Sequence, residues 1–474
     1  MAPEPRMLFS WDDVETRPEL QRLELALDAL PDEALLAELG KRRGAGRNDF
    51  PVAAMWRAVI AGIVFQHASV ESLLRELNRN PALLDLCGFN PLPVHRRGGN
   101  GRIADTVPNG WNVSRFLKML VDIEEEQGLV SAMADDLRAA LMAEIPDFGR
   151  HLGYDGKAVG SHSTGVEGRE TGRTSDPDAD WGRHETSGAR RNGRPWTKVT
   201  SWFGYRLHVI ADTRHEIPVA VSLTRASASE VKELKRMASG LMERDPALAG
   251  RCSAFSADRG LDSGPLKAAL RDRWRIRPLI DTRLMWRAER DEPGHDASVP
   301  VTRPLDPDRA DTMVHSERGE LFCICPETGE QRSMAFEGFE RDRETLKCRC
   351  PAAAGGFDCA GRAACLKMGG SKAGACGRVV RIPLATADRR IFTPTPWGSP
   401  WQRGYSRRSA LERINSRIDR MYGMESHFVR GRAKMALRCD LVVAVMMATA
   451  LGHVRAGRPE MMRSLVRGPC LKAA

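Results

Sequence analysis

The stretch Lys198-Val-Thr-Ser-Trp-Phe-Gly-Tyr-Arg-Leu-His-Val-Ile-Ala-Asp212 decides the fold class of this chain. Its β-branched and aromatic residues predict a strand. Thr213–Glu216 then predicts a tight turn, and Ile217–Leu223 predicts the second strand of a hairpin. The sequence therefore predicts an antiparallel hairpin in the middle of the chain.

Upstream of the hairpin, His151–Lys157 predicts a short strand that contains Asp155. The intervening residues Gly160–Pro195 have few large apolar side chains and many Gly, Ser, Thr, Asp and Arg. Such a composition predicts a long loop that becomes ordered when a ligand binds.

Downstream of the hairpin, helical and strand-like segments alternate. They are a helix opened by the capping-box pattern Ser227-x-x-Glu230, a strand Ser253–Ala257 ending at Asp258, a helix Ser263–Asp272 capped by Asp262, and a strand Arg277–Ile280. An antiparallel meander followed by strands joined through helices is the element order of an RNase H-like α/β fold. We therefore predict this fold class for the catalytic region.

The length of 474 residues exceeds what one core normally supports, so several domains are expected. The sequence predicts a helical N-terminal domain, an RNase H-like core in two parts, a cysteine-containing subdomain inserted between those parts, and a tail. The predicted bounds are 1–145 for the helical domain, 146–280 and 391–456 for the core, 281–390 for the insertion and 457–474 for the tail. The second part of the core contains helices predicted over Tyr405–Tyr422 and Asp440–Val454.

The charge balance favours a polyanionic partner. Lys and Arg total 72 against 62 Asp and Glu, and the excess is concentrated between Trp401 and Asp440. The N-terminus lacks a signal-peptide pattern, and the longest apolar run, Leu441–Leu451, is too short to cross a bilayer. We therefore expect a cytoplasmic protein without a membrane partner.

The chain has eleven cysteines, and seven of them lie within one segment. Their density suits a structural Zn²⁺ site, whereas the C-x-C spacing of the close pairs differs from the C-x-x-C pairs of zinc ribbons. Structural zinc and a reduced subdomain with free thiols both remain open. The seven are Cys323, Cys325, Cys348, Cys350, Cys359, Cys365 and Cys376.

Three carboxylates carry the functional prediction. Asp155 and Asp258 follow or end predicted strands, and Glu412 lies on a predicted helix rich in arginine. Carboxylate oxygens are the hard ligands that Mg²⁺ prefers, and a pair of such ions promotes phosphodiester cleavage. Alone, either aspartate would more often be a turn former or helix cap, and Glu412 could belong to a surface helix. Together, in this order, they predict a two-ion site that acts on nucleic acid.

Four segments in this order resemble the DDE-type transposases of bacterial insertion sequences that have a Tyr-Arg-Glu-Lys signature. The segments are Tyr154-Asp155-Gly156-Lys157, Trp202-Phe203-Gly204-Tyr205-Arg206-Leu207-His208, Asp258-Arg259-Gly260-Leu261 and Tyr405-x-x-Arg408-x-x-x-Glu412. The resemblance implies binding of terminal inverted repeats, metal-dependent DNA cleavage and transfer of 3′ ends into target DNA. It also implies a homodimer on DNA in the bacterial cytoplasm, associated with the nucleoid.

The resemblance implies roles for individual residues. Asp155, Asp258 and Glu412 would be the catalytic ligands of two Mg²⁺ ions, for which Mn²⁺ could substitute. Tyr405 and Arg408 would lie near the DNA backbone. The signature also has a lysine seven residues after the glutamate, where this chain has Asp419, and the phosphate-holding cation stays open between Arg408, Arg417 and Arg420.

A second cationic segment lies between the predicted strands. Arg190, Arg191 and Arg194 precede Trp196, and cations among aromatic residues suit DNA binding. The alternative for this segment is a flexible solvated loop. Two alternatives for the whole protein also remain: a catalytically inactive, transposase-derived DNA-binding regulator, which the departure at Asp419 motivates, and an RNase H-like nuclease without strand transfer.

Overall fold

The computed structural model describes residues 18–44, 50–90, 106–165, 174–189, 194–283, 285–286, 300–306, 313–368, 378–383 and 399–463. The chain forms two compact units. The first unit comprises Met1–Arg251 and Ser409–Ala474, and the second comprises Cys252–Arg408. The protein is mixed α/β, with helices at the N-terminus and with both antiparallel and parallel strand pairs, as the predicted fold class requires.

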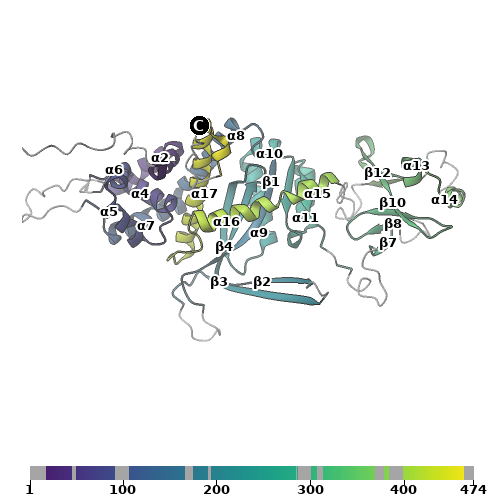
Figure 1. The fold of residues 1–474 in the computed structure, drawn as a ribbon, viewed down its shortest axis with the longest axis horizontal. Coiled ribbons are helices and arrows are strands. Elements are labelled where there is room, and N and C mark those ends of the chain that lie inside the picture. The colour runs from purple at the N-terminus through teal and green to yellow at the C-terminus, as the bar shows by residue number, and fades with distance from the viewer. Residues whose placement is uncertain are drawn as a thin grey trace, which may run out of the picture. The chain divides into compact units, whose positions relative to one another are not determined.

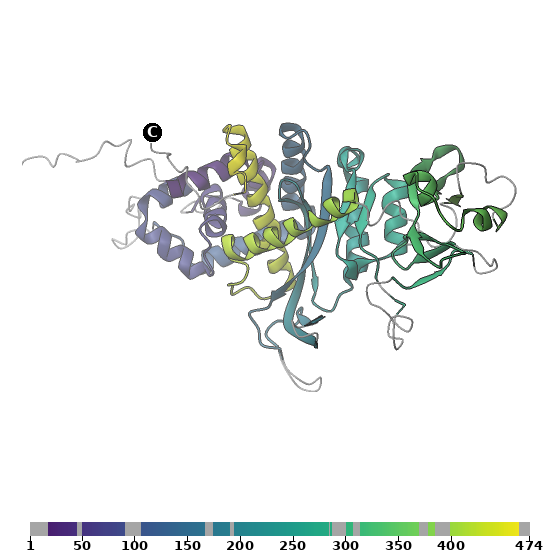
Figure 2. The same ribbon diagram turned by 45° about the vertical axis from the view of Figure 1, so that its right-hand side comes forward.

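The N-terminal part of the first unit is helical, as predicted. These helices pack on one side of α17 (Arg432–Arg455), which contacts α2, α4, α7 and α8 and also packs on β4 (Ile217–Arg225) of the sheet (Figure 2). By length and hydropathy α17 could span a membrane, but most of its apolar window is buried inside the protein. The N-terminal helices are α2 (Pro18–Ala29), α3 (Glu33–Arg43), α4 (Val52–Val64), α5 (Val70–Arg79), α6 (Pro81–Cys87), α7 (Gly110–Gln127) and α8 (Leu129–Glu144).

The sheet of the first unit is built around one long strand, β3 (Pro195–Asp212). Its C-terminal half pairs antiparallel with β1 (His151–Gly160) on one edge and with β4 (Ile217–Arg225) on the other. The predicted hairpin and the predicted strand around Asp155 are therefore confirmed. Asp155 lies opposite Val209 in the β1–β3 register.

The prediction of one long loop over Gly160–Pro195 is wrong. Asp180–Ala189 forms β2, which pairs with the N-terminal half of β3. Both strands are largely exposed there, so the ladder is held by backbone hydrogen bonds and by cross-strand pairs such as Trp181 with Phe203, whose ring centroids are 5.6 Å apart. Since neither face is buried, β2 lacks the apolar alternation by which a strand is recognised in sequence.

Two helices cover opposite faces of this sheet. Successive side chains of β1 point to opposite faces. The hydroxyl of Tyr154 approaches the carbonyl of Glu230 in α9 (Glu230–Arg244), whereas the next residue, Asp155, contacts α16 (Ser409–Met421), which crosses the sheet in Figure 1. The N-cap of α9 is Ser229 and not Ser227, so the predicted capping box is wrong. The unit is completed by α10 (Pro246–Arg251) and a short 3₁₀ turn, η4 (Pro459–Met461).

The single helix predicted over Tyr405–Tyr422 is instead two helices. The first, α15 (Ser399–Ser406), packs against β5 and β6 of the second unit, and the second, α16, packs against β1 of the first. A turn between them, closed by a hydrogen bond from Arg408 N to Tyr405 O of 2.9 Å, lets each helix follow its own strands.

The second unit contains a parallel strand pair, β5 (Ala254–Ala257) and β6 (Arg277–Ile280), close to the predicted bounds. The connection between them is α11 (Gly264–Ala268) continued by a π-helical turn, η2 (Ala269–Arg273). Asp262 is not the predicted helix cap, since Ser263 occupies that position. The buried carboxylate of Asp262 instead pairs with Lys267 at 2.7 Å, because a buried ammonium group requires an anionic partner.

The cysteine-containing part of the second unit consists of short strands and turns. They form one sheet in the order β10-β9-β8-β7 and another in the order β11-β12-β13. The elements of this part are β7 (Thr302–Pro304), β8 (Met313–Ser316), β9 (Leu321–Ile324), β10 (Gln331–Ser333), β11 (Ala335–Glu340), η3 (Arg341–Arg343), β12 (Thr345–Arg349), α13 (Pro351–Gly355), α14 (Arg362–Met368) and β13 (Val379–Pro383). A short 3₁₀ turn, η1 (Arg259–Leu261), lies outside this part and follows β5 directly after Asp258.

Candidate active site

Asp155 is held between its own strand and α16. Its Oδ2 atom accepts a hydrogen bond of 2.8 Å from Nδ2 of Asn415, and its Oδ1 atom accepts one of 3.0 Å from the backbone N–H of Gly156. The side chain is half-buried. Two donors from different elements thus fix the orientation of the carboxylate.

The face of α16 that meets β1 also carries Glu412. Ala410, Leu411, Ile414 and Ile418 are buried and anchor the helix. Residues three and four apart lie on the same side of a helix. Glu412 is three residues before Asn415, so it lies on the side of α16 that faces Asp155, and its side chain is exposed.

The same side of α16 ends in an ion pair. Asp419 is four residues after Asn415, and its carboxylate lies 2.5 Å from Nζ of Lys157 on β1. Both side chains are 14% exposed. Burial raises the pKa of Asp419, and the ammonium group of Lys157 opposes that rise. Strand β1 and helix α16 are therefore joined by two polar contacts, one at Asp155 and one at Lys157.

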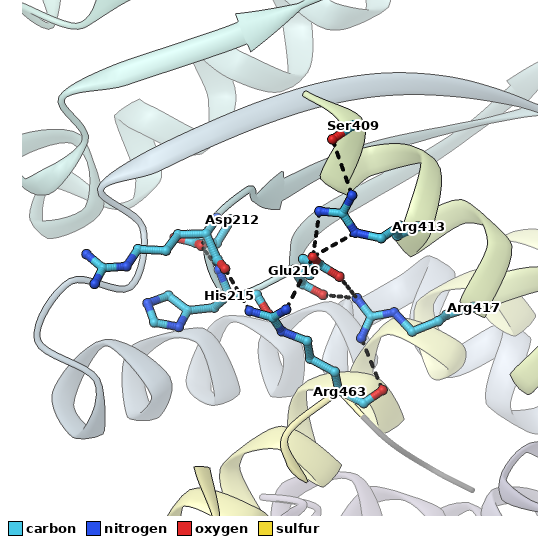
Figure 3. Close-up of polar contacts among 8 residues, drawn as sticks. Asp212, His215, Glu216, Ser409, Arg413, Arg417 and Arg463 are labelled. Carbon is cyan, nitrogen blue, oxygen red and sulfur yellow. Dashed lines mark hydrogen bonds and ion pairs between the residues drawn. The ribbon is translucent and has the colours of Figure 1, made fainter. Parts of the chain in front are cut away.

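A different set of contacts joins α16 to the turn between β3 and β4 (Figure 3). The carboxylate of Glu216 in this turn accepts hydrogen bonds from Arg413 at 2.8 Å and from Arg463 at 3.3 Å. Arg417 lies 3.7 Å from the other carboxylate oxygen and also donates to the backbone carbonyl of Glu216. One buried carboxylate thus binds three guanidinium groups, two of which belong to α16.

The turn itself is shaped by Asp212, which is fully buried. Its Oδ1 accepts the backbone N–H groups of Arg214 and His215, and its Oδ2 accepts that of Gly149 at 2.7 Å. Burial raises the pKa of Asp212, and these N–H donors oppose the rise. Glu216 has a φ of +59°, an uncommon conformation for a residue with a side chain, and is held there by its three arginines.

In the second unit, Asp258 follows β5 directly. Its side chain is exposed, and its Oδ1 accepts the backbone N–H of Arg259 at 2.9 Å. Asp281 follows β6 in the same way. Because β5 and β6 are parallel and Ala257 lies opposite Ile280, the two aspartates follow at the same edge. Asp281 is buried, and its Oδ1 has no hydrogen-bond partner within the described part of the chain.

Tyr405 and Arg408 lie in the same electrostatic environment as Asp258. The pKa of Tyr405 is raised mainly by burial; Arg408 opposes this, while Asp258 and Asp281 add to it. The guanidinium carbon of Arg408 is 5.8 Å from the centre of the Tyr405 ring. Tyr405 also stacks on Trp401.

The other predicted DNA-binding residues have varied surroundings. Arg417 is 12% exposed and bound to Glu216, which favours a structural role. Arg420 is exposed on α16, and Arg194 is exposed just before β3. Arg190 and Arg191 lie outside the described residues.

Sequence reasoning missed Asn415, Glu216 and Asp281 as candidate site residues. Asp281 carries a detectable signal, because it follows a predicted strand as Asp258 does. Asn415 lies at helical spacing from Glu412, but many polar residues share that spacing. The role of Glu216 depends on three arginines that are distant in sequence, so no local pattern reveals it.

Metal binding at these carboxylates depends on the donor atoms that surround them. Across the described ranges, no three His, Cys, Asp or Glu side chains gather into a group that could hold an ion. Asn415, however, places a buried Oδ1 without a hydrogen-bond partner, among the described residues, beside Asp155. Mg²⁺ binds through one or two carboxylates together with waters and substrate phosphates. Asp155 and its neighbour are therefore suitable donors for such an ion.

The cysteines give a different result. Cys323, Cys325, Cys350, Cys359 and Cys365 line one cavity of about 370 Å³. Hydrogen bonds from Thr328 and its neighbours lower the pKa of Cys325 to about 7. No described group of three thiols could hold a metal ion, and Cys376 lies outside the described residues. The described thiols alone therefore do not form a zinc site, and structural zinc in this segment stays a prediction.

One family comparison bears on these residues. The family model described as "Transposase DDE domain" matches residues 155–448, more than half of the chain. The match begins at Asp155 and includes Asp258 and Glu412. No curated protein matches the chain.

Proposed function

The chain belongs to the Transposase DDE domain family, and we propose that it is the transposase of a bacterial insertion sequence. It binds the terminal inverted repeats, cleaves the DNA there and transfers the 3′ ends to target DNA, as a dimer that holds two ends. The observation that carries this proposal is the family match, because it spans all three acidic residues.

We propose Asp155, Asp258 and Glu412 as the ligands of divalent cations, with Mg²⁺ as the natural ion and Mn²⁺ as a substitute. When bound, such ions activate the attacking oxygen and stabilise charge on the leaving oxygen. The hydrogen bond from Asn415 orients the carboxylate of Asp155, and outer partners of this kind tune a ligand. Glu216 and the arginines that bind it, Arg413, Arg417 and Arg463, form the Glu216 cluster. This cluster holds α16, and with it Glu412, against the sheet.

The proposed DNA contacts combine the signature residues Tyr405 and Arg408 with other arginines, chosen for their positive charge. We assign Tyr405, Arg408, Arg420, Arg190, Arg191 and Arg194 to the DNA backbone. Arg417 was also a candidate from sequence, but its bonds to Glu216 support the positioning of α16 instead. The helical N-terminal region is proposed to recognise the element ends.

The test uses the full chain and duplexes made from the DNA that flanks its coding region. With Mg²⁺, the wild-type protein is expected to nick these ends and to join them to a target duplex. Asp155→Asn, Asp258→Asn and Glu412→Gln should each lower cleavage on the order of 10³-fold, while binding to the ends persists. If one of these variants cleaves DNA as fast as the wild-type protein, the substituted residue is not a metal ligand.

A second function is favoured by one observation, the aspartate at position 419 where the signature has lysine. An inactive DNA-binding regulator would bind the ends with salt-dependent affinity and would not cut them in Mg²⁺. A nuclease without strand transfer would cut the ends but leave the target duplex unjoined. The same assay separates all three functions.

A further inference from the structure

The ion pair between Lys157 and Asp419 places a positive charge beside the proposed metal ligands. Lys157 is two residues after Asp155 on β1, so the two side chains share the sheet face that α16 covers. Nζ of Lys157 lies 2.5 Å from the carboxylate of Asp419. The ammonium group is thus held at the helix position where the signature has a lysine of its own.

The other cations of α16 are directed elsewhere. Arg413 and Arg417 bind Glu216, and each lies two residues from Asn415, on nearly the opposite side of the helix. Arg420 is three residues after Arg417 and therefore continues their stripe. The side of α16 that faces Asp155 carries Glu412, Asn415 and Asp419, so its cation comes from the strand.

An ion pair buried to this degree contributes little net stability. Removing two charges from water costs about as much as their attraction returns, and a well-packed apolar pair is often equally stable. A lysine ammonium has three donors, and a carboxylate partner does not use all of them. Lys157 can therefore be held by Asp419 and still donate to a phosphate oxygen.

We propose that Lys157, positioned by Asp419, is the cation that contacts the DNA phosphate in place of the signature lysine. This inference rests on the proposed function. The pair is a reversal of the signature: the strand supplies the ammonium group, and the helix supplies the carboxylate that holds it. An ammonium group is present at the site although the residue at position 419 is an aspartate, and the pair itself is neutral.

The test compares an apolar pair with an exchanged pair. Lys157→Met/Asp419→Leu removes both charges and should melt like the wild type. Lys157→Asp/Asp419→Lys exchanges the charges and returns a lysine to position 419. Lys235→Met, at an exposed position of α9, controls for the loss of one positive charge.

The deciding measurement is the salt dependence of binding to the flanking-DNA duplex in metal-free buffer, which does not require cleavage. The apolar pair should reduce the slope of log K against log salt by about 1, and the exchanged pair and Lys235→Met should keep the wild-type slope. Cleavage in Mg²⁺ should fall about 10²-fold in the apolar pair and recover in the exchanged pair. An unchanged slope in a folded apolar pair overturns the inference, whereas a wild type that binds but never cleaves overturns only the proposed function.

Discussion

Helix α16 is attached to the sheet of the first unit in two different ways. Toward β1 it uses single contacts to candidate functional groups, Asn415 with Asp155 and Asp419 with Lys157. Toward the turn between β3 and β4 it uses arginines that converge on Glu216. The first attachment involves side chains that would also meet metal or DNA, whereas the second involves side chains that bind each other.

This difference explains how Glu412 on α16 can be both exposed and fixed in place. The contacts toward β1 must be able to share their donors with a ligand, so they cannot be the main anchor of the helix. The Glu216 cluster lies on nearly the opposite side of α16 and needs no ligand. We expect changes in the cluster to alter stability first, and changes toward β1 to alter metal or DNA dependence first.

The largest effect is expected for Glu216→Ala. Arg417 is mostly buried and would lose its anion, which typically costs about 3–5 kcal/mol. Denaturant unfolding of the full chain measures the loss. Glu216→Gln keeps the oxygen acceptor and the turn and should lose less. Equal stability of the Ala and Gln variants would show that the carboxylate charge does not anchor the helix.

The next largest effect on stability is expected for His208, which contacts Tyr154 on the face of the sheet opposite to Asp155. Its Nδ1 lies 2.5 Å from the hydroxyl of Tyr154, and burial lowers its pKa to about 4. The unfolded chain protonates His208 near pH 6.5 and the folded chain does not, so stability is lost as pH falls from about 6.5 to about 4. The loss should reach about 3 kcal/mol.

Comparison with His208→Gln isolates this contribution from other titrating groups. The variant should lose less stability than the wild type over the same pH range, because its amide does not protonate. Parallel pH profiles for the two proteins would mean that His208 is not held neutral by burial. Thermal unfolding at several pH values provides the profiles.

The strands and helices of the fold differ in how far the sequence predicts them. Sequence predicts the strand around Asp155, the hairpin and the two strands followed by Asp258 and Asp281, because apolar and β-branched residues mark buried strands. Strand β2 was missed because both of its faces are exposed. The break between α15 and α16 was missed because Tyr405 and Glu412 share helical spacing even though their helices pack on different strands.

For the site, sequence could supply residue types but not partners. The acidic residues were found from their position after strands and from a family resemblance. Whether an arginine of α16 faces DNA or a carboxylate depends on Glu216, which lies about 200 residues earlier in the chain. The partners Lys157 and Asp419 are 262 residues apart, so in sequence they appear as a lysine without an assigned role and an unexplained departure from the signature.

A smaller effect is expected for Asn415→Ala, on the side that faces β1. Loss of an outer partner of a metal ligand typically weakens metal binding 10–100-fold, so the Mg²⁺ concentration for half-maximal cleavage should rise by about that factor. Stability should change little, in contrast to Glu216→Ala. Ser416→Ala, at the exposed neighbouring position, is the control. An unchanged Mg²⁺ dependence would separate Asn415 from the site.

The smallest effect is expected for Arg413→Ala, within the Glu216 cluster itself. The side chain of Arg413 is 56% exposed, and exposed ion pairs contribute about 0.2–1 kcal/mol. Arg417 is 12% exposed, so Arg417→Ala should cost more. Salt screens exposed charges more strongly than buried ones, so the effect of Arg413→Ala should shrink between low and high ionic strength while that of Arg417→Ala persists. Equal salt sensitivity of the two variants in unfolding would mean that burial does not divide the cluster, and that its three arginines hold α16 as equivalent charges.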